Sequence, residues 1–159
     1  MQLSLHAEYA LRALLYLGTK SGSSPVVSTS EISRAYGISK HHLVRVMHTL
    51  SECGYVRLVL GRAGGVVLDK DPAHIRLGDV VRQAELTLRL AECFDHKTNT
   101  CGIAPVCSLR PVLKHALDDF IESLNRHTLA DLLAGGAQQK MAEKFVQLAS
   151  HADETKMMS

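Results

Sequence analysis

The fold is decided by residues 28–45, which read STSEISRAYGISKHHLVR. Ser28 and Glu31 have the spacing of a capping box, in which each side chain satisfies a free backbone amide of the other residue. They predict a short helix that ends at Gly37. A second helix is predicted over 40–53, and two helices joined by so short a turn are typical of a helix-turn-helix. The alternative is an ordinary corner between two helices of a small helical domain.

Two segments rich in β-branched and aromatic residues, 55–60 and 66–68, follow the second helix directly. The glycine-rich linker 61–65 is expected to supply the positive backbone angles of a tight hairpin turn. A phosphate-binding loop is disfavoured, because the linker lacks the Gly-x-x-x-x-Gly-Lys-Ser/Thr pattern and no helix follows it. A hairpin in this place is a wing, which favours DNA binding over a simple helical corner.

Positive charge is concentrated in the same region. The basic side chains of residues 34–62 are Arg34, Lys40, Arg45, Arg57 and Arg62, against the single acid Glu52. The side chains of the second helix expected to face inward are Leu43, Val44, Met47 and Leu50. Its basic N-terminal end is then left outside, where free amides and the helix dipole suit phosphates and base edges.

A run of charge is most often only a solvated surface, but the helix-turn-helix and the wing favour a DNA-binding interpretation here. The residues predicted to contact DNA are Ser28, Ser39, Lys40, His41, His42, Arg45, Arg62 and Gly64.

Further amphipathic helices are predicted over 5–17, 75–90 and 109–124. The last is either a core helix or a two-fold dimer helix, and the need for two DNA half-sites favours the dimer. The side chains expected at that interface are Leu113, Leu117, Phe120 and Leu124. Thr128 and Asp131 are expected to cap a short helix, and the segment after about His151 to be a frayed tail.

These elements predict a mainly α-helical fold, a winged helix-turn-helix with a small β-hairpin wing and a long dimerisation helix. The DNA-binding domain is expected to span residues 1–80 and to include the first helix. A linker helix and a cysteine loop follow over 81–108, and the dimerisation helix and a short helix over 109–134. A C-terminal helix with a flexible tail is expected over 135–159.

The cysteines are unevenly placed, since Cys93, Cys101 and Cys107 lie within fifteen residues while Cys53 stands alone in a helical pattern. In a cytoplasmic chain such thiols stay reduced, and a cluster of them is more often metal-binding or catalytic than disulfide-forming. The spacing has no Cys-x-x-Cys pair and matches no standard zinc site. Three thiols leave the usual set of four ligands one short.

Composition limits the class of protein. With 159 residues, 46% hydrophobic and 21% charged, the chain has globular proportions. Few aromatic residues and no Trp disfavour a carbohydrate site or a single-strand nucleic-acid platform. Glu8 and Arg12 interrupt the first apolar segment, and no segment is long enough to span a bilayer, so we expect a cytoplasmic protein with no membrane partner. No nucleophile–base set points to an enzyme.

The order of motifs along residues 1–133 resembles the NsrR family, the nitric-oxide-sensing group of the winged-helix iron–sulfur regulators, to which IscR also belongs. The matching segments are 35–39, 43–45, 50–51, 53–56, Gly61, Gly64–Gly65, 75–80, the three clustered cysteines and 128–132. The resemblance implies a homodimeric repressor that binds double-stranded operator DNA and carries an iron–sulfur cluster. It also implies that nitric oxide attacks the cluster and releases the DNA.

For the cluster, the resemblance implies Cys93, Cys101 and Cys107 as ligands, with Glu8 of the partner subunit as the fourth. Arg12 lies one helical turn from Glu8 and is expected to hold that carboxylate in position. Thiolates are the ligands that iron–sulfur clusters require, and a weakly held carboxylate leaves one iron open to attack. The alternative for Glu8 and Arg12 is an ordinary surface ion pair.

The ligand region departs from the family pattern. Seven residues separate Cys93 from Cys101, where the family usually has five, and Glu8 stands where the family usually has Asp. A [4Fe–4S] cluster is the family expectation and a [2Fe–2S] cluster is the alternative, with His96 as a substitute ligand. Arg110 stands where IscR has a ligand His, which disfavours ligation of that type.

The wing also departs from the family, because Leu60 replaces the usual Arg and Arg62 is expected to take over its groove contact. Three alternative functions remain: an IscR-type two-iron regulator, a winged-helix protein with a structural zinc, and a small electron carrier. An electron carrier needs no recognition helix and normally supplies all four ligands from one chain. Zinc would be colourless and unresponsive to nitric oxide.

Overall fold

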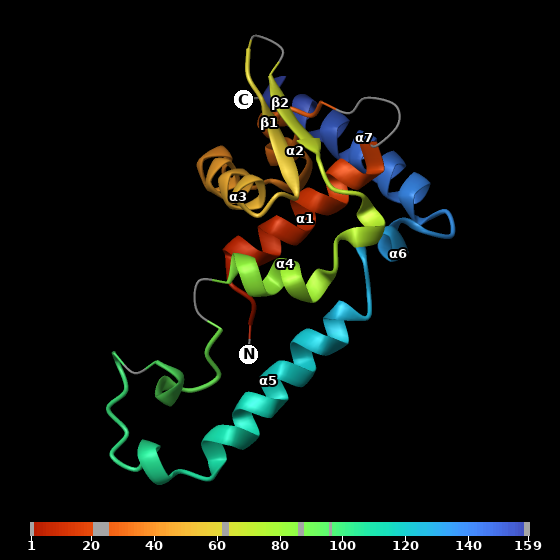
Figure 1. Cartoon of the computed structure of the whole chain (residues 1–159). Helices are drawn as coiled ribbons and strands as arrows, with labels where there is room; N and C mark the ends of the chain where they lie inside the picture. Colours follow the sequence, from red (N-terminus) through yellow and green to blue (C-terminus); the bar gives the residue numbers. More distant parts are fainter. Residues whose placement is uncertain (1, 21–25, 62–63, 86–87, 96, 158–159) are drawn as a thin grey trace.

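The computed structural model describes residues 2–20, 26–61, 64–85, 88–95 and 97–157, with side chains described as far as residue 149. Its elements are α1 (Leu5–Lys20), α2 (Thr29–Tyr36), α3 (Lys40–Glu52), β1 (Val56–Val59), β2 (Gly65–Leu68), α4 (Leu77–Ala84), α5 (Leu109–Asn125), α6 (Leu129–Leu133) and α7 (Ala137–Met157) (Figure 1). Short 3-10 turns lie at Pro72–His74, Glu92–Phe94 and Ala104–Val106. The mainly helical fold with a two-stranded antiparallel hairpin is the one that the sequence predicted.

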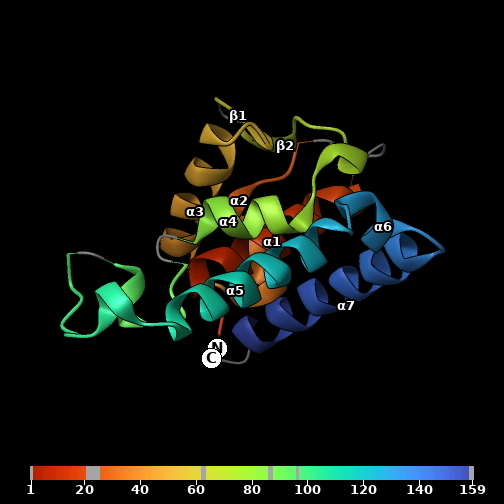
Figure 2. The ribbon, with the colours of Figure 1, turned by 60° about the horizontal axis from the view of Figure 1, so that its bottom comes forward.

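Helix α1 is the centre of the core. It packs against α3, α4, α6 and α7 (Figure 2). Helix α5 packs against α4 on the side away from α1 (Figure 1). The buried apolar side chains of α1 are Ala7, Ala10, Ala13, Leu14, Tyr16 and Leu17. Because these residues recur at helical spacing around much of α1, neighbours can pack on several sides of it. None of the helices in the described ranges is both long and apolar enough to cross a membrane.

The helix-turn-helix of α2 and α3 is present, but its caps differ in detail from the prediction. The Ser28 hydroxyl accepts a hydrogen bond from the Glu31 amide at 3.1 Å, as expected. The Glu31 carboxylate accepts from the Tyr16 hydroxyl at 2.8 Å and pairs with Lys20, so it ties α2 to α1. Ser39 stands at the N-cap of α3, but its side chain makes no capping hydrogen bond.

The first strand of the hairpin is shorter than predicted, the second begins one residue earlier than predicted, and the linker glycines serve two purposes. Gly61 has a φ of +112°, as a tight turn requires. The linker thus has the positive angle expected of it, at Gly61, and Gly64 and Gly65 have another role. They provide space instead, because a Cβ on Gly65 would lie 2.4 Å from the Val27 carbonyl oxygen. Val27 forms a bridge with Val66, which attaches the wing to the chain before α2.

Helix α4 ends at Ala84, so the helix predicted over 75–90 is too long. Glu85 has an extended backbone, and its carboxylate accepts from the Ser4 amide at 2.6 Å. The helix therefore ends where the Glu85 side chain contacts the N-terminal segment. The short helix α6 begins at the predicted capping box of Thr128 and Asp131.

Helix α7 continues to Met157, where the sequence predicted a frayed tail after about His151. Residues 137–157 are rich in Ala, Gln, Lys and Glu, which favour helix. Phe145 holds α7 to the body, because its ring lies 4.7 Å from the Tyr16 ring and 5.2 Å from the Tyr36 ring, measured between centroids.

Candidate functional site

The outer face of α3 is polar and exposed. The side chains buried on its inner face are Leu43, Val46, Met47 and Leu50. Val44 was expected to face inward, but it is 48% exposed and Val46 is buried in its place. At about 100° per residue, the side chains of Leu43, Val46, Met47 and Leu50 fall within one arc of the helix, and Val44 lies outside that arc.

Most of the predicted DNA-contacting residues are accessible. Those exposed on α2, α3 and their caps are Ser28, Ser39, Lys40, His41, His42 and Arg45. Gly64 is half-buried at the base of the turn, and Arg62 lies outside the described residues. Figure 1 shows the hairpin beside α3, on the side of α1 away from α5. The helix and the wing thus form one surface.

A contact between α1 and α3 fixes the position of this surface. The Nε2 atom of His6 lies 3.1 Å from the Thr49 hydroxyl, within hydrogen-bonding distance. Burial, followed by the positive charge of Arg45, lowers the pKa of His6 from its usual 6.5. The imidazole is therefore neutral near pH 7, and α3 is joined to α1 by an uncharged hydrogen bond.

The three clustered cysteines lie on the loop between α4 and α5, which extends away from the body (Figure 1). Cys93, Cys101 and Cys107 are all half-buried free thiols. In the part of the chain that the structure describes, no group of three His, Cys, Asp or Glu side chains is close enough to hold a metal. The thiols share a loop but do not converge in the isolated chain.

Cys53 differs from these thiols in place and chemistry. It caps the C-terminal end of α3, away from the loop. Burial, and to a lesser extent the charge of Glu52, raises the pKa of the Cys53 thiol. Cys53 is therefore protonated at neutral pH and is a poor metal ligand.

The segment between the first two cysteines is organised by Asp95, which the sequence analysis did not single out. Its carboxylate pairs with Arg89 at 2.7 Å and accepts from the Lys97 amide at 2.9 Å and the Thr98 hydroxyl at 3.0 Å. The Cys101 amide in turn donates to Asn99 Oδ1 at 3.1 Å. The longer segment between Cys93 and Cys101 is thus stabilised by its own ion pair and hydrogen bonds. His96, the alternative ligand, lies outside the described residues.

Glu8 and Arg12 form an ion pair on α1, and both side chains are more than one-third exposed. The Arg12 guanidinium carbon lies 5.8 Å from the centroid of the Tyr36 ring and 5.9 Å from that of Tyr9. The Tyr36 hydroxyl donates to the Arg12 carbonyl at 3.0 Å. Two aromatic rings therefore restrict Arg12, and Arg12 in turn restricts the partly exposed Glu8 carboxylate through the ion pair.

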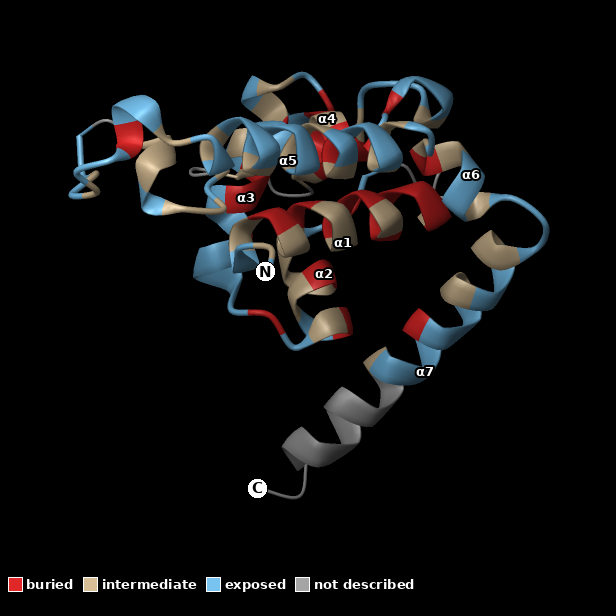
Figure 3. Ribbon diagram, turned by 90° about the horizontal axis from the view of Figure 1, so that it is seen from below, coloured by how far each residue is buried: buried red, intermediate tan, exposed pale blue. Residues whose placement is uncertain are grey.

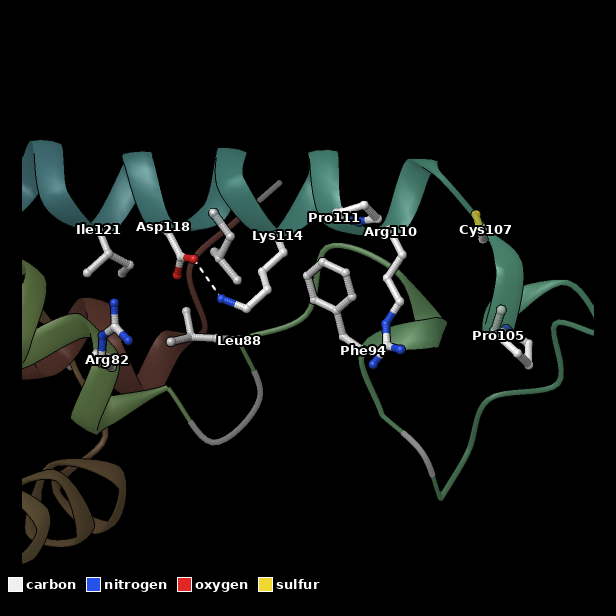
Figure 4. Close-up of a pocket in the computed structure, with 12 residues that line it drawn as sticks. Arg82, Leu88, Phe94, Pro105, Cys107, Arg110, Pro111, Lys114, Asp118 and Ile121 are labelled. Carbon is white, nitrogen blue, oxygen red and sulfur yellow. Dashed lines mark hydrogen bonds and ion pairs between the residues drawn. The ribbon is translucent and has the colours of Figure 1, made fainter.

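A cavity of about 590 Å³ lies between α4, the cysteine loop and α5 (Figure 4). Cys107 and Phe94 line it from the loop, and its basic side chains are Arg82, Arg110 and Lys114. Lys114 donates to Asp118 at 2.8 Å, and this hydrogen bond lowers the pKa of Asp118. Positive charge therefore lies on the α4 and α5 walls of the cavity that Cys107 lines from the loop.

The outer face of α5 is not covered by the described part of the chain (Figure 3). Ile121 is the one fully buried side chain described on α5. The predicted interface residues Leu113, Leu117, Phe120 and Leu124 are half-buried. The sequence analysis missed the most exposed apolar side chains beside them, which are Ile103, Val106, Leu109 and Val112, between 57% and 84% exposed.

Comparisons with known proteins agree on one family. Residues 3–135 match the family model Rrf2, described as an iron-dependent transcriptional regulator. The HTH-type transcriptional regulator NsrR of Geobacillus kaustophilus is 44% identical over 133 residues, which cover 84% of this chain and 90% of that protein. The protein of the same name from Bacillus subtilis is 39% identical over the same shares of both chains.

Solved structures agree with these relatives. The structure of T. potens IscR has a TM-score of 0.65 and 26% identity, and the match covers 84% of this chain and 86% of that one. CymR, the global cysteine regulator of B. subtilis, has a TM-score of 0.62 and 27% identity, over 83% and 95% of the two chains. The resemblance found in the sequence is confirmed, and helix α7 lies beyond the region that the family model matches.

Proposed function

The chain belongs to the Rrf2 family of iron-dependent transcriptional regulators, and from this premise we propose that it is a homodimeric repressor that senses nitric oxide. In this proposal an iron–sulfur cluster is the sensor, and nitric oxide releases the protein from double-stranded operator DNA in the cytoplasm. The observation that carries the proposal is the pairing of an exposed α3–wing surface with a separate loop bearing three free thiols.

The DNA-binding part consists of α3 and the hairpin. Lys40, His41, His42 and Arg45 project from the N-terminal half of α3 and would enter the major groove, with the hairpin beside them. Two such helices must be about 34 Å apart to reach adjacent half-sites. We assign the dimer contact to the uncovered apolar face of α5, because the described part of the chain has nothing to bury it.

The donor set fits an iron–sulfur cluster. Cys93, Cys101 and Cys107 are soft thiol ligands on one loop, and Arg110, which lines the same cavity as Cys107, would offset part of the negative charge of the thiolates. Glu8 of the partner subunit would supply the missing ligand. We propose a [4Fe–4S] cluster rather than a [2Fe–2S] cluster, and when bound it supplies iron that reacts with nitric oxide.

The fourth ligand explains how sensing would reach the DNA. Arg12 holds the Glu8 carboxylate on α1, and α1 packs directly against α3. If Glu8 is a ligand of the cluster held by the partner subunit's loop, it would therefore fix the spacing of the two α3 helices. When Glu8 is displaced, this constraint is lost, and a coupling of about 1–3 kcal/mol per site is enough to lower operator occupancy strongly.

The ligand assignment is tested by anaerobic purification followed by absorption spectroscopy and native mass spectrometry. Cys93→Ala, Cys101→Ala and Cys107→Ala are each expected to lose the visible absorption and the added mass of iron and sulfide. Cys53→Ala is the matched control, because its thiol lies on α3 and not on the loop. Full colour in all three loop variants would refute the assignment, and a colourless wild type containing zinc would favour the structural-zinc alternative.

The cross-subunit role of Glu8 is tested with mixed dimers. When a Glu8→Ala subunit pairs with a Cys107→Ala subunit, ligation from the partner subunit restores one complete site per dimer. Ligation within a subunit would leave no complete site. Isolated heterodimers are therefore expected to carry close to one cluster, and a value near zero would show that Glu8 does not act across the interface.

A further inference from the structure

We propose that Val44 recognises a thymine methyl group in the major groove, and so sets base specificity at one position of each half-site. This inference rests on the DNA-binding function and adds a specificity-determining residue to it. Val44 is 48% exposed on a helix whose other described apolar side chains are buried. It belongs neither to the hydrophobic core nor to the side chains packed against that core.

The position of Val44 on α3 places it on the surface assigned to DNA. His41 is three residues before it and His48 four residues after it, so the three side chains form one row along the helix. His41 and His48 are both exposed, and Arg45 is exposed beside the row. Figure 1 shows α3 at the outer edge of the molecule next to the hairpin. An apolar side chain therefore lies in the middle of a polar, outward-facing surface.

The chemistry of the major groove limits what this side chain can recognise. Among the four bases, thymine alone presents an apolar group there, its C5-methyl, while the other groove-edge groups are hydrogen-bond donors or acceptors. Valine strongly prefers one χ1 rotamer in a helix, so its methyl groups are already fixed before DNA binds. His41, Arg45 and His48 can donate hydrogen bonds to neighbouring bases. Val44 thus fits a thymine flanked by bases that accept hydrogen bonds.

The test uses the full-length protein purified anaerobically and a duplex that it selects from random-sequence DNA. Each thymine of that duplex is replaced in turn by deoxyuridine, which lacks only the methyl group. At one thymine per half-site, wild type is expected to bind about fourfold more weakly, the value for burying one methyl-sized group. Val44→Ala is expected to bind the thymine and deoxyuridine duplexes equally.

Val146→Ala is the matched control, because Val146 is 64% exposed on α7, outside the DNA surface. It should keep the full deoxyuridine effect. Selection repeated with Val44→Ala should return duplexes with no preference for thymine at that position. The proposal is overturned if wild type binds every deoxyuridine duplex unchanged, or if Val44→Ala keeps the wild-type loss. If wild type selects no duplex at all, DNA binding itself is refuted and this inference with it.

Discussion

Gly78→Ala should test how α5 is attached to the rest of the protein. Gly78 lies in the first turn of α4, against the C-terminal half of α5. A Cβ at this position would lie 2.3 Å from the Ile121 carbonyl oxygen and 2.6 Å from Asn125 Oδ1. An ordinary carbon–oxygen contact is about 3.3 Å, so α4 and α5 would have to separate by about 1 Å.

That separation breaks a pair of hydrogen bonds between the two helices. Asn125 Oδ1 accepts from the Asp79 amide at 2.8 Å, and Asn125 Nδ2 donates to Asp79 Oδ1 at 3.1 Å. Overpacking costs about 1–3 kcal/mol and each lost hydrogen bond about 1 kcal/mol. The higher helix propensity of alanine offsets about 0.5–1 kcal/mol of this destabilisation. We therefore expect the free energy of unfolding to fall by about 2–4 kcal/mol.

The assay is urea unfolding of the metal-free, reduced protein, followed by far-ultraviolet circular dichroism. Gly102→Ala is the control, because a Cβ there meets no described atom within 4 Å and the backbone φ is ordinary. Its expected change is within about 0.5 kcal/mol. Equal unfolding free energies for Gly78→Ala and Gly102→Ala would refute the close approach of α4 and α5.

Four other predictions concern the DNA surface, the α1–α3 contact and α7. Arg45→Ala is expected to weaken operator binding by about 1–3 kcal/mol in fluorescence anisotropy, and unchanged affinity would remove α3 from the interface. Leu60→Arg adds a cation at a wing position that is 93% exposed, so the slope of log affinity against log salt should steepen by about 0.9. An unchanged slope would show that the wing does not approach phosphates. The pKa of His6 is lowered by burial, so the unfolded chain binds the proton more readily, and stability should fall as the pH drops below 6.5. His6→Asn should reduce this pH dependence of the urea midpoint, and an unaltered dependence would assign it to other groups. Phe145→Ala removes a ring that is 8% exposed and should cost about 3–5 kcal/mol, whereas an unchanged melting temperature would mean that α7 adds no stability.

The elements predicted well are those marked by local signals. Hydrophobic spacing and caps located α1, α3 and α5 to within a few residues, and the Thr128–Asp131 capping box located α6. The errors arise where a contact from a distant part of the chain decides the role of a residue. The Glu31 carboxylate bonds to Tyr16 of α1, and Gly65 is small because Val27 lies against it.

The candidate site was predictable in its residue types but not in its geometry. Cysteine spacing and the family resemblance singled out the loop, and the exposed face of α3 followed from its periodicity. Asp95 was missed because its partners Arg89 and Thr98 share no recognisable motif with it. Val44 was misplaced because an apolar residue next to Leu43 fits either face of a helix until the packing is known.

The central claim is that one event at the cysteine loop controls DNA binding. The direct measurement is an anaerobic titration of the purified protein with nitric oxide, following cluster absorption and operator binding in the same samples by spectroscopy and gel shift. The account predicts that both signals change together in wild type, and that Glu8→Ala binds the operator weakly with little further response. Full operator binding after the cluster absorption has been bleached, or a Glu8→Ala variant that binds fully and is still released by nitric oxide, would contradict it.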